Sequence, residues 1–444
     1  MINQNDKYKD SSVEWIGMIP KTWNCIKLKF TIKSASSGGT PNSSYDSYYN
    51  ENGIPWVTIS DITHNDYIFD TEKHLTNLAI IDKRLKIYEK NTILLAMYAS
   101  VGKVAELCVN ATINQAILAI DFDNNKIINE FAKYCFNAYE PFIKSESNGT
   151  TQFNLNANKV LNLIIPFTDL SIQKKITTIL NEKIYQINSL ISNQKKQIEK
   201  LKEYKQALIT KIVTNGLSDN PEMKSSGVEW IGKIPCGWNI YPIKYLFSFS
   251  KGLSITKEDL RESGIKVISY GQLHSKKNLS VKVDSSLYRF VSEKYLESNP
   301  ECLVSVNDMI MADTSEDLEG TCDFVRIDKE EKIFAGYHSI IFQNKQKINT
   351  EYLAYQFTTD IWRNQFRSKV NGVKLFSLTQ KILNQGLVIL PDECNQKAIV
   401  DYINKKCGKI YQLIDIKQQK IEKLNEYKKS IIYEYVTGKK EVQL

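Results

Sequence analysis

Apolar residues recur at alternating intervals of three and four along two stretches of the chain, residues 171–216 and 393–444. In the first stretch they are Ile184, Ile187, Ile191, Ile198, Leu201 and Leu208, and in the second Ile410, Ile414, Ile421, Leu424 and Ile431. This spacing is the heptad pattern of a coiled coil. Neither glycine nor proline interrupts the first stretch before Gly216. The pattern therefore predicts one helix of about 40 residues, roughly 60 Å long.

The two stretches are copies of one sequence. Ile-Glu-Lys-Leu-Lys-Glu-Tyr-Lys at 198–205 recurs as Ile-Glu-Lys-Leu-Asn-Glu-Tyr-Lys at 421–428, and other matched pairs keep the same separation of 223 residues. Polar residues interrupt both apolar seams at corresponding places, Gln194 with Lys417 and Lys205 with Lys428. Such interruptions cost stability and restrict the register of a helix pair. A solvated surface helix would not need the same apolar stripe, with polar residues at the same places, in both copies. We therefore expect the two helices to pack together.

The short link between the helices and the next segment fixes their expected direction. Residues 217–227 are polar and span at most ~40 Å. That reach is too short to run back along a helix of ~60 Å. The second copy should therefore start at the far end of the first, which gives an antiparallel pair with a pseudo-two-fold axis.

The segments before the helices predict two globular domains of mixed α/β (α+β) class. Apolar runs typical of strands occur at 54–59, 92–97 and 116–120, and again at 265–269, 309–311 and 339–342. The predicted boundaries are 1–170 for the first domain, 171–216 for the first helix, 217–392 for the second domain and 393–444 for the second helix. The chain is thus a duplicated unit, with two domains separated by an antiparallel pair of long coiled-coil helices.

Each domain opens with the same motif, in which Trp15 and Trp23 correspond to Trp230 and Trp238. Paired tryptophans can stack on bases. Their fixed spacing, in domains that otherwise differ, favours a small buried plug instead.

Composition limits the compartment and the partners. No apolar run approaches ~18 residues, so neither a membrane span nor a signal peptide is expected. The eight cysteines contain no Cys-x-x-Cys, which argues against a structural zinc site or disulfide framework and fits a reducing cytoplasm. The net charge of +8 permits a nucleic-acid partner. The positive excess lies on the two helical stretches, and the domains are close to neutral.

Motifs for catalysis are missing from the sequence. It has no Asn/Asp-Pro-Pro-aromatic motif of a DNA methyltransferase and no Gly-x4-Gly-Lys-Ser/Thr of an ATPase. Glu203-Tyr-Lys205 and Glu426-Tyr-Lys428 match half of a nuclease motif, but they lie on the coiled-coil stretches, where packing explains them better. We therefore expect no catalytic residue and no metal site in this chain.

The doubled motifs resemble the specificity subunit of a type I restriction–modification system over nearly the whole chain. They are the Val-Glu-Trp-Ile-Gly-x-Ile-Pro-x-x-Trp openings and the Ile-Glu-Lys-Leu-x-Glu-Tyr-Lys helices. The first domain adds Gly38-Gly-Thr-Pro41, Trp56–Ile62, Ser100–Lys103 and Ile113–Ala116. The second domain lacks Gly-Gly-Thr-Pro and has Asp313-Thr-Ser315 where Ser100–Lys103 would fall.

The resemblance implies two target-recognition domains that bind double-stranded DNA at an asymmetric bipartite site, with the helices setting the spacing of the half-sites. It implies a non-catalytic subunit that assembles with two methyltransferase subunits and with restriction subunits that translocate DNA. No cofactor is expected on this chain, whereas S-adenosylmethionine, ATP and Mg²⁺ are expected on the partners.

Base contacts are expected from polar side chains on domain loops. The candidates in the first domain are Ser60, Ser100, Lys103, Gln115, Thr151 and Gln152; those in the second are Tyr270, Gln272, His274, Lys276, Thr314, His338 and Lys374. Each could equally be an ordinary exposed polar residue, and a single histidine without spaced partners is more often structural. The acidic run 315–319 is expected to be a solvated turn, with a cytosine amino group as a possible alternative partner.

Three other functions remain open on sequence grounds. The chain could serve a different restriction–methylation assembly, such as a fused enzyme. It could be a scaffold that does not bind DNA and whose coiled coil docks proteins. A self-sufficient methyltransferase is the enzyme alternative, and its missing motifs argue against it.

Overall fold

The computed structural model describes residues 7–42, 44–145, 155–346, 348–370 and 375–442, apart from the side chains of 143–145. The chain divides into two compact units. Unit 1 comprises Met1–Lys195 with Gln418–Leu444, and unit 2 comprises Lys196–Lys417. Each unit therefore contains one globular domain and a part of each long helix.

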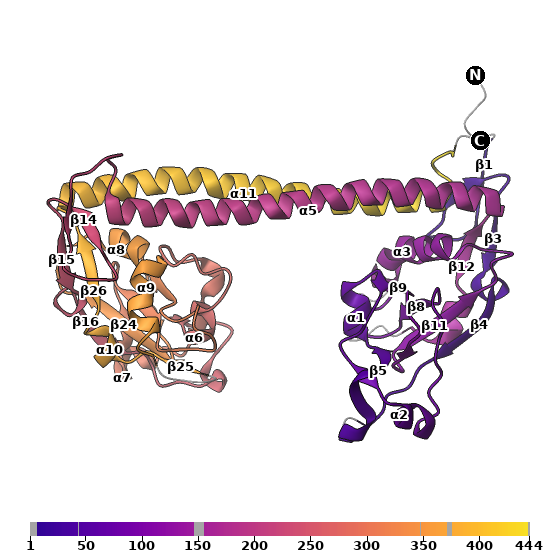
Figure 1. The fold of residues 1–444 in the computed structure, drawn as a ribbon, viewed down its shortest axis with the longest axis horizontal. Helices are drawn as coiled ribbons and strands as arrows, with labels where there is room; N and C mark the ends of the chain where they lie inside the picture. The colour runs from indigo at the N-terminus through magenta and orange to yellow at the C-terminus, as the bar shows by residue number, and fades with distance from the viewer. Residues whose placement is uncertain (1–6, 43, 146–154, 347, 371–374, 443–444) are drawn as a thin grey trace. The chain divides into compact units, whose positions relative to one another are not determined.

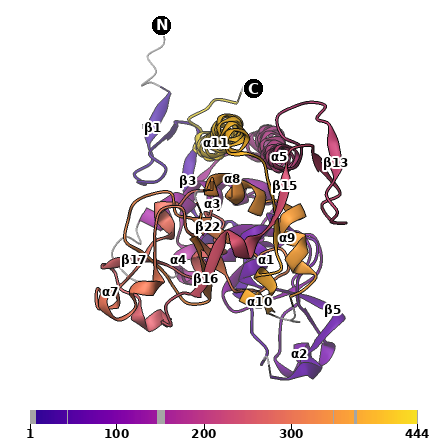
Figure 2. The same ribbon diagram turned by 90° about the vertical axis from the view of Figure 1, so that its left-hand side faces the viewer.

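Two long helices, α5 (Leu170–Asn215) and α11 (Glu393–Val436), account for both heptad stretches. In Figures 1 and 2 they lie side by side. All eleven apolar residues of the predicted seam are buried or half-buried. In the described ranges, neither these nor any other helix is long and apolar enough to cross a membrane. The prediction of two long helices is confirmed.

The polar residues in the seam bind the facing helix. In unit 1, Lys428 Nζ donates a hydrogen bond to Asn188 Oδ1 (3.2 Å). In unit 2, Lys205 Nζ donates to Tyr411 Oη (3.2 Å). In the 223-residue repeat, Asn188 corresponds to Tyr411 and Lys205 corresponds to Lys428. The second contact is therefore the first one repeated with the helices exchanged. The two helices are therefore antiparallel, as predicted, and the lysines mark their register.

The domain of unit 1 is built on a five-stranded sheet of order β4-β11-β8-β9-β6, next to a smaller sheet of order β10-β5-β7. Its strands are β1 (Tyr8–Asp10), β2 (Met18–Pro20), β3 (Asn24–Lys27), β4 (Ile32–Ser37), β5 (Tyr49–Val57), β6 (Tyr67–Ile68), β7 (His74–Leu75), β8 (Ile93–Ala96), β9 (Val104–Leu107), β10 (Thr112–Ile113), β11 (Ile117–Phe122) and β12 (Ile164–Phe167). Its short helices are α1 (Ile59–His64), α2 (Asn77–Asp82), α3 (Asn129–Ser145) and α4 (Ala157–Leu161).

The three strands predicted in this domain are present as β5, β8 and β11. The prediction for 54–59 was wrong at its end, because β5 stops at Val57 and α1 begins at Ile59. Thr58 caps this helix, since its backbone N–H and its hydroxyl both donate to the Asp61 carboxylate. A cap of this kind ends the strand and starts the helix within two residues.

The domain of unit 2 repeats the architecture with two four-stranded sheets, β16-β24-β20-β22 and β18-β17-β23-β19. Its strands are β13 (Met223–Ser225), β14 (Lys233–Pro235), β15 (Asn239–Pro242), β16 (Phe247–Lys251), β17 (Ile265–Ile268), β18 (Arg289–Val291), β19 (Leu303–Val304), β20 (Met309–Ala312), β21 (Thr314–Ser315), β22 (Phe324–Arg326), β23 (Ile333–Ala335), β24 (Ser339–Asn344), β25 (Phe376–Ser377) and β26 (Leu387–Leu390). Its short helices are α6 (Tyr270–Leu273), α7 (Tyr295–Ser298), α8 (Thr350–Phe357), α9 (Asp360–Arg367) and α10 (Gln380–Leu383). The strands predicted at 265–269, 309–311 and 339–342 are confirmed as β17, β20 and β24.

Each domain is attached to its long helix by the same polar contact. Tyr134 Oη of α3 donates a hydrogen bond to Asn181 Oδ1 of α5 (2.5 Å). In unit 2, Tyr355 Oη of α8 donates to Asn404 Oδ1 of α11 (2.6 Å), and Asn404 Nδ2 donates to Glu351 (2.9 Å). The asparagine that recurs in the two sequence copies is thus the residue that holds a domain to its helix.

The tryptophan pairs are partly as expected. Trp15, Trp23 and Trp238 are buried, whereas Trp230 is 37% exposed, so the predicted plug is wrong for Trp230. Gly438, with φ of +69°, ends α11 against Trp23, and Gly216, with φ of +78°, ends α5 against Trp238. A left-handed glycine is the usual way to end a helix.

Asn404→Ala should lower the free energy of unfolding by about 1–2 kcal/mol, because it removes two hydrogen bonds of a half-buried group. Asn181→Ala should cost less, because Asn181 is exposed and its bond to Glu130 is 3.4 Å long. Urea denaturation of the full chain measures both, with Asn193→Ala at an exposed position of α5 as control. Equal and negligible effects of all three substitutions would contradict the attachment role.

Candidate nucleic-acid interface

Three segments of the first domain meet beside the carboxyl end of β8. The loop 97–103 joins β8 to β9, residues 114–116 join β10 to β11, and α1 follows β5. Met97 N donates to Ala116 O (2.9 Å), and Asn114 N donates to Val57 O (3.0 Å). These backbone bonds bring loops from distant parts of the sequence to one edge of the domain.

Three predicted residues of the first domain lie on these segments. Ser60 on α1 and Gln115 are exposed, and Ser100 is half-buried. The Ser100 hydroxyl lies 2.6 Å from that of Thr63, so it joins the loop 97–103 to α1 through two neutral groups. The polar edge thus has side chains that could reach a base, held by a contact that contains no charge.

Lys103 faces a different surface. Its ammonium lies 3.5 Å from Glu140 Oε1 on α3. It lines a cleft between the domain and the helices of unit 1, together with Asn188 and Lys429. The Lys103 side chain therefore lies at this cleft, although its backbone N–H donates to the Ser100 carbonyl oxygen (3.1 Å) on the same loop. Thr151 and Gln152 lie outside the described residues.

The second domain has a longer loop, residues 313–323, at the place of 97–103. The equivalence follows from matching backbone bonds: Leu155 N donates to Met97 O (3.1 Å), and Leu378 N donates to Asp313 O (2.7 Å). This loop contains five carboxylates and no lysine or arginine. At the same position in one architecture, the two domains therefore present different chemistry.

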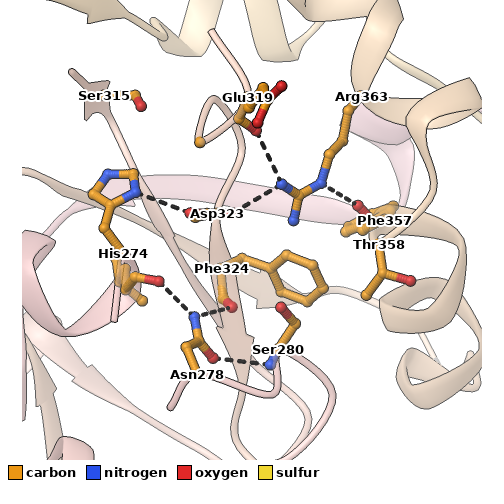
Figure 3. A network of polar contacts seen from close by, with 12 residues as sticks. His274, Asn278, Ser280, Ser315, Glu319, Asp323, Phe324, Phe357, Thr358 and Arg363 are labelled. Atoms are coloured by element: carbon orange, nitrogen blue, oxygen red, sulfur yellow. Dashed lines mark hydrogen bonds and ion pairs between the residues drawn. The ribbon is translucent and has the colours of Figure 1, made fainter. Parts of the chain in front are cut away.

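His274 joins this loop to α6 through both ring nitrogens, and Figure 3 shows the contact with Asp323. Nε2 lies 2.9 Å from the Thr314 carbonyl oxygen, and Nδ1 lies 2.9 Å from Asp323 Oδ2. A carbonyl and a carboxylate can only accept, so both contacts are hydrogen bonds only when both nitrogens carry a proton, that is, in the imidazolium form. Burial lowers the pKa of His274, but the bonds to Asp323 and Thr314 and the charge of Asp317 outweigh it. The net pKa lies above the ordinary 6.5.

Arg363 of α9 completes the network from the other side (Figure 3). Its Nη1 donates to Asp323 Oδ1 (2.8 Å), and its Nε donates to Phe357 O (3.0 Å). The Asp323 carboxylate is therefore held between two cations, and the loop is tied to both α6 and α9.

The other predicted residues of the second domain have unequal roles. The Tyr270 ring lies 4.7 Å from His274, and its hydroxyl donates to Glu316 (3.3 Å). The Gln272 side chain accepts from Ser269 N and caps α6, so it is already engaged. Thr314 contributes its carbonyl to His274. His338 is exposed and lies 3.3 Å from Asp313, and Lys276 is exposed. Lys374 lies outside the described residues.

One cavity of about 600 Å³ is lined by Tyr270, His274 and four carboxylates, those of Glu316, Asp317, Glu319 and Asp323. The structure thus brings Tyr270 and His274 together with the acidic run 315–319. Sequence reasoning missed Asp323 and Arg363. No local pattern marks them, because Arg363 lies 40 residues beyond Asp323 and the fold alone brings them into contact. Among the described residues, no group of histidine, cysteine or carboxylate side chains is arranged to hold a metal ion.

A family model of known proteins matches both halves of this chain. Residues 20–200 and 235–437 both match the type I restriction modification DNA specificity domain. The matches cover most of the chain and fall one on each half of the duplication. The chain therefore belongs to this family, and the resemblance found in its motifs is confirmed.

Individual relatives agree over the full length. The chain is 23% identical to the type I restriction enzyme MjaIX specificity subunit of Methanocaldococcus jannaschii, over 96% of both chains. It is 22% identical to the MjaVIII specificity subunit of the same organism, over 95% of this chain and 93% of that one. A solved structure from work on complex assembly and conformational transition of the type I R-M system has a TM-score of 0.65 at 12% identity. It covers 94% of this chain and 98% of that chain. This structural likeness shows the shared fold.

Arg363→Ala should destabilise the protein by about 2–3 kcal/mol, because it removes one of the two cations that bind the part-buried Asp323 carboxylate and the donor to the Phe357 carbonyl oxygen. Arg289→Ala is the matched control, since Arg289 is exposed and bonds only to nearby carbonyls, and it should stay within about 0.5 kcal/mol of wild type. Chemical denaturation followed by far-ultraviolet circular dichroism measures the difference. Equal stability of the two variants would show that Arg363 does not hold the loop.

Proposed function

We propose that this chain is the DNA-reading subunit of a type I restriction–modification assembly and that its two domains recognise two different half-sites. The observation that carries this is one architecture present twice with unlike loops at the equivalent place. The loop 97–103 has a neutral link to α1, whereas the loop 313–323 is acidic and linked through a cation. Identical readers would require a symmetric site, so unlike readers fit an asymmetric one.

We further propose that the chain is not catalytic. The relatives are named specificity subunits, which supports a role in recognition. In this proposal, methyltransferase subunits bind S-adenosylmethionine and restriction subunits bind ATP and Mg²⁺, while this chain selects the DNA. Among the candidate residues, the side chains of Ser100, Gln272 and His274 make loop and helix contacts that suit a positioning role.

Two methyltransferase subunits would need two equivalent docking surfaces, and the helices offer a repeated one. In unit 1, Asn188 and Asn425 each directly follow a seam residue and line the cleft below the domain. Residues directly before a seam residue lie on the opposite flank of the seam. At that position unit 1 has Leu190 and Tyr427, and unit 2 has the repeated pair Leu413 and Tyr204. All four are exposed large apolar side chains.

Single exposed apolar residues are ordinary, but the same pair repeated in both units needs an explanation. In each unit the antiparallel register brings the leucine of one helix near the tyrosine of the other. Packing of an apolar helix face against each pair would bury it. The repetition supports two copies of one partner rather than two different partners.

Sequencing of modified bases in genomic DNA tests the proposed function. Cells that express the chain with its neighbouring methyltransferase gene should gain one methylated motif made of two unlike halves around a fixed gap. Cells with the methyltransferase alone should lack it. If both proteins are soluble and associated but no chain-dependent motif forms, the DNA-reading proposal fails and the scaffold alternative gains support.

Tyr204→Ala combined with Tyr427→Ala should prevent methyltransferase binding, and each single variant should leave a complex with one methyltransferase. Native mass spectrometry of the purified complex gives the stoichiometry directly. Tyr185→Ala is the control, since Tyr185 is also exposed on α5 but lies at the cleft of the domain side. Two bound methyltransferases on the double variant would exclude this surface.

A further inference from the structure

The attachment of the recognition loop differs in charge between the two domains. In the first domain the loop 97–103 is joined to α1 by the hydroxyls of Ser100 and Thr63. In the second, the loop 313–323 is joined to α6 by the His274 ring. Helices α1 and α6 are equivalent, since each follows the strand (β5 or β17) that pairs with β10 or β23 in parallel. The link between the loop 97–103 and α1 therefore contains no ionisable group, whereas the link between the loop 313–323 and α6 depends on a proton.

We propose that His274 is a positioning residue whose protonated ring holds the loop 313–323 in place, so that recognition of the second half-site alone weakens as pH rises. This inference rests on the function proposed above, because it assumes that the loop faces DNA. His274 acts through the loop and not by touching a base. Its earlier candidacy as a base contact is replaced, since both ring nitrogens already have partners within the protein.

The geometry requires the proton. Loss of the proton from Nδ1 would place a lone pair against the Asp323 carboxylate, and loss from Nε2 would place one against the Thr314 carbonyl oxygen. Either form removes one of the two bonds that join α6 to the loop. Among the described residues, it also leaves Arg363 as the remaining cationic partner of Asp323. The two ends of the loop, at Thr314 and Asp323, are therefore held to one ring only while it is charged.

The surroundings of the ring add to the effect. Asp317 lies on the same loop and favours the charged ring. The Tyr270 ring of α6 packs against it edge to face, with its hydroxyl bonded to Glu316. Gly320 lies so close that an added Cβ would be 3.2 Å from His274 Nδ1 and 2.7 Å from Ser315 Oγ. Arg363 of α9 binds the same Asp323 carboxylate as the His274 ring. It therefore acts on the ring through that shared carboxylate.

The sign of the pH effect follows from the raised pKa of His274. A group whose pKa is higher in the folded loop stabilises that loop fully at pH values below its ordinary pKa. The contribution is lost as pH rises through the raised value. The hydroxyl attachment in the first domain does not titrate in this range. The two half-sites of one DNA molecule therefore serve as each other's control.

The test uses the assembled complex of the full chain with its methyltransferase subunits. The probes are a fluorescent duplex with the mapped site and two duplexes with one half-site scrambled in each. From about pH 6 to about pH 8.5, discrimination against the scrambled second half-site should fall about tenfold. Discrimination against the scrambled first half-site should change less than about twofold. This wild-type comparison needs no substitution that might affect folding.

Two variants sharpen the assignment. His274→Gln keeps a side-chain donor but cannot be charged, so its discrimination at the second half-site should be low and independent of pH. His74→Gln removes a histidine that is paired with Asp70 in the first domain, far from the loop 313–323 in sequence, and should keep the wild-type profile at the second half-site. Equal pH responses at both half-sites, or a wild-type profile in His274→Gln, would overturn the inference alone. No preference for the mapped duplex at any pH would overturn the proposed function as well.

Discussion

The packing of two antiparallel helices along one apolar seam is the constraint on which the rest of each unit depends. A helix of 46 residues is not held straight by its own hydrogen bonds alone, and burial of its apolar stripe gives it a partner and a direction. Lysines at two places in the seam bond across it, at Asn188 in unit 1 and at Tyr411 in unit 2. A sliding helix would break these bonds, so the polar residues trade some stability for a single register. Each domain then takes its position from the helix to which it is bound.

The duplicated and the diverged residues of the chain have different physical roles. Asn181 and Asn404 recur because each bonds a tyrosine of its own domain, and loss of either would loosen a domain from its helix. The strands of the two sheets recur because they bury the same kind of surface. The loops after β8 and β20 are not subject to these packing limits. They can change length and charge while the scaffold stays the same, which is what a family of DNA readers needs.

The loops 97–103 and 313–323, which face DNA in the proposed function, differ in charge. An acidic loop next to DNA is repelled by phosphates, so its carboxylates are useful only if they are held away from the backbone or aimed at amino groups. Asp323 is neutralised between His274 and Arg363, while Glu316, Asp317 and Glu319 remain at the cavity. The neutral loop of the first domain needs no such compensation. The second domain thus holds its acidic loop with a half-buried ionic network.

The heptad seams, the antiparallel direction and most central strands follow from local patterns in the sequence, because periods of 3.5 and 2 report directly which side chains are buried. The repeat itself revealed the duplicated architecture and the family. The end of β5 was missed because the Thr58 cap acts over only three residues and interrupts an apolar run. His274 and Tyr270 were predicted as base contacts, and their contacts with the loop 313–323 could not be predicted from the sequence. His274 meets Thr314, Asp323 and, through that carboxylate, Arg363 only because β20, β22 and α9 bring together residues 40 to 89 positions apart. Whether a histidine touches DNA or holds a loop is decided by what faces its two nitrogens, and only the tertiary structure determines that.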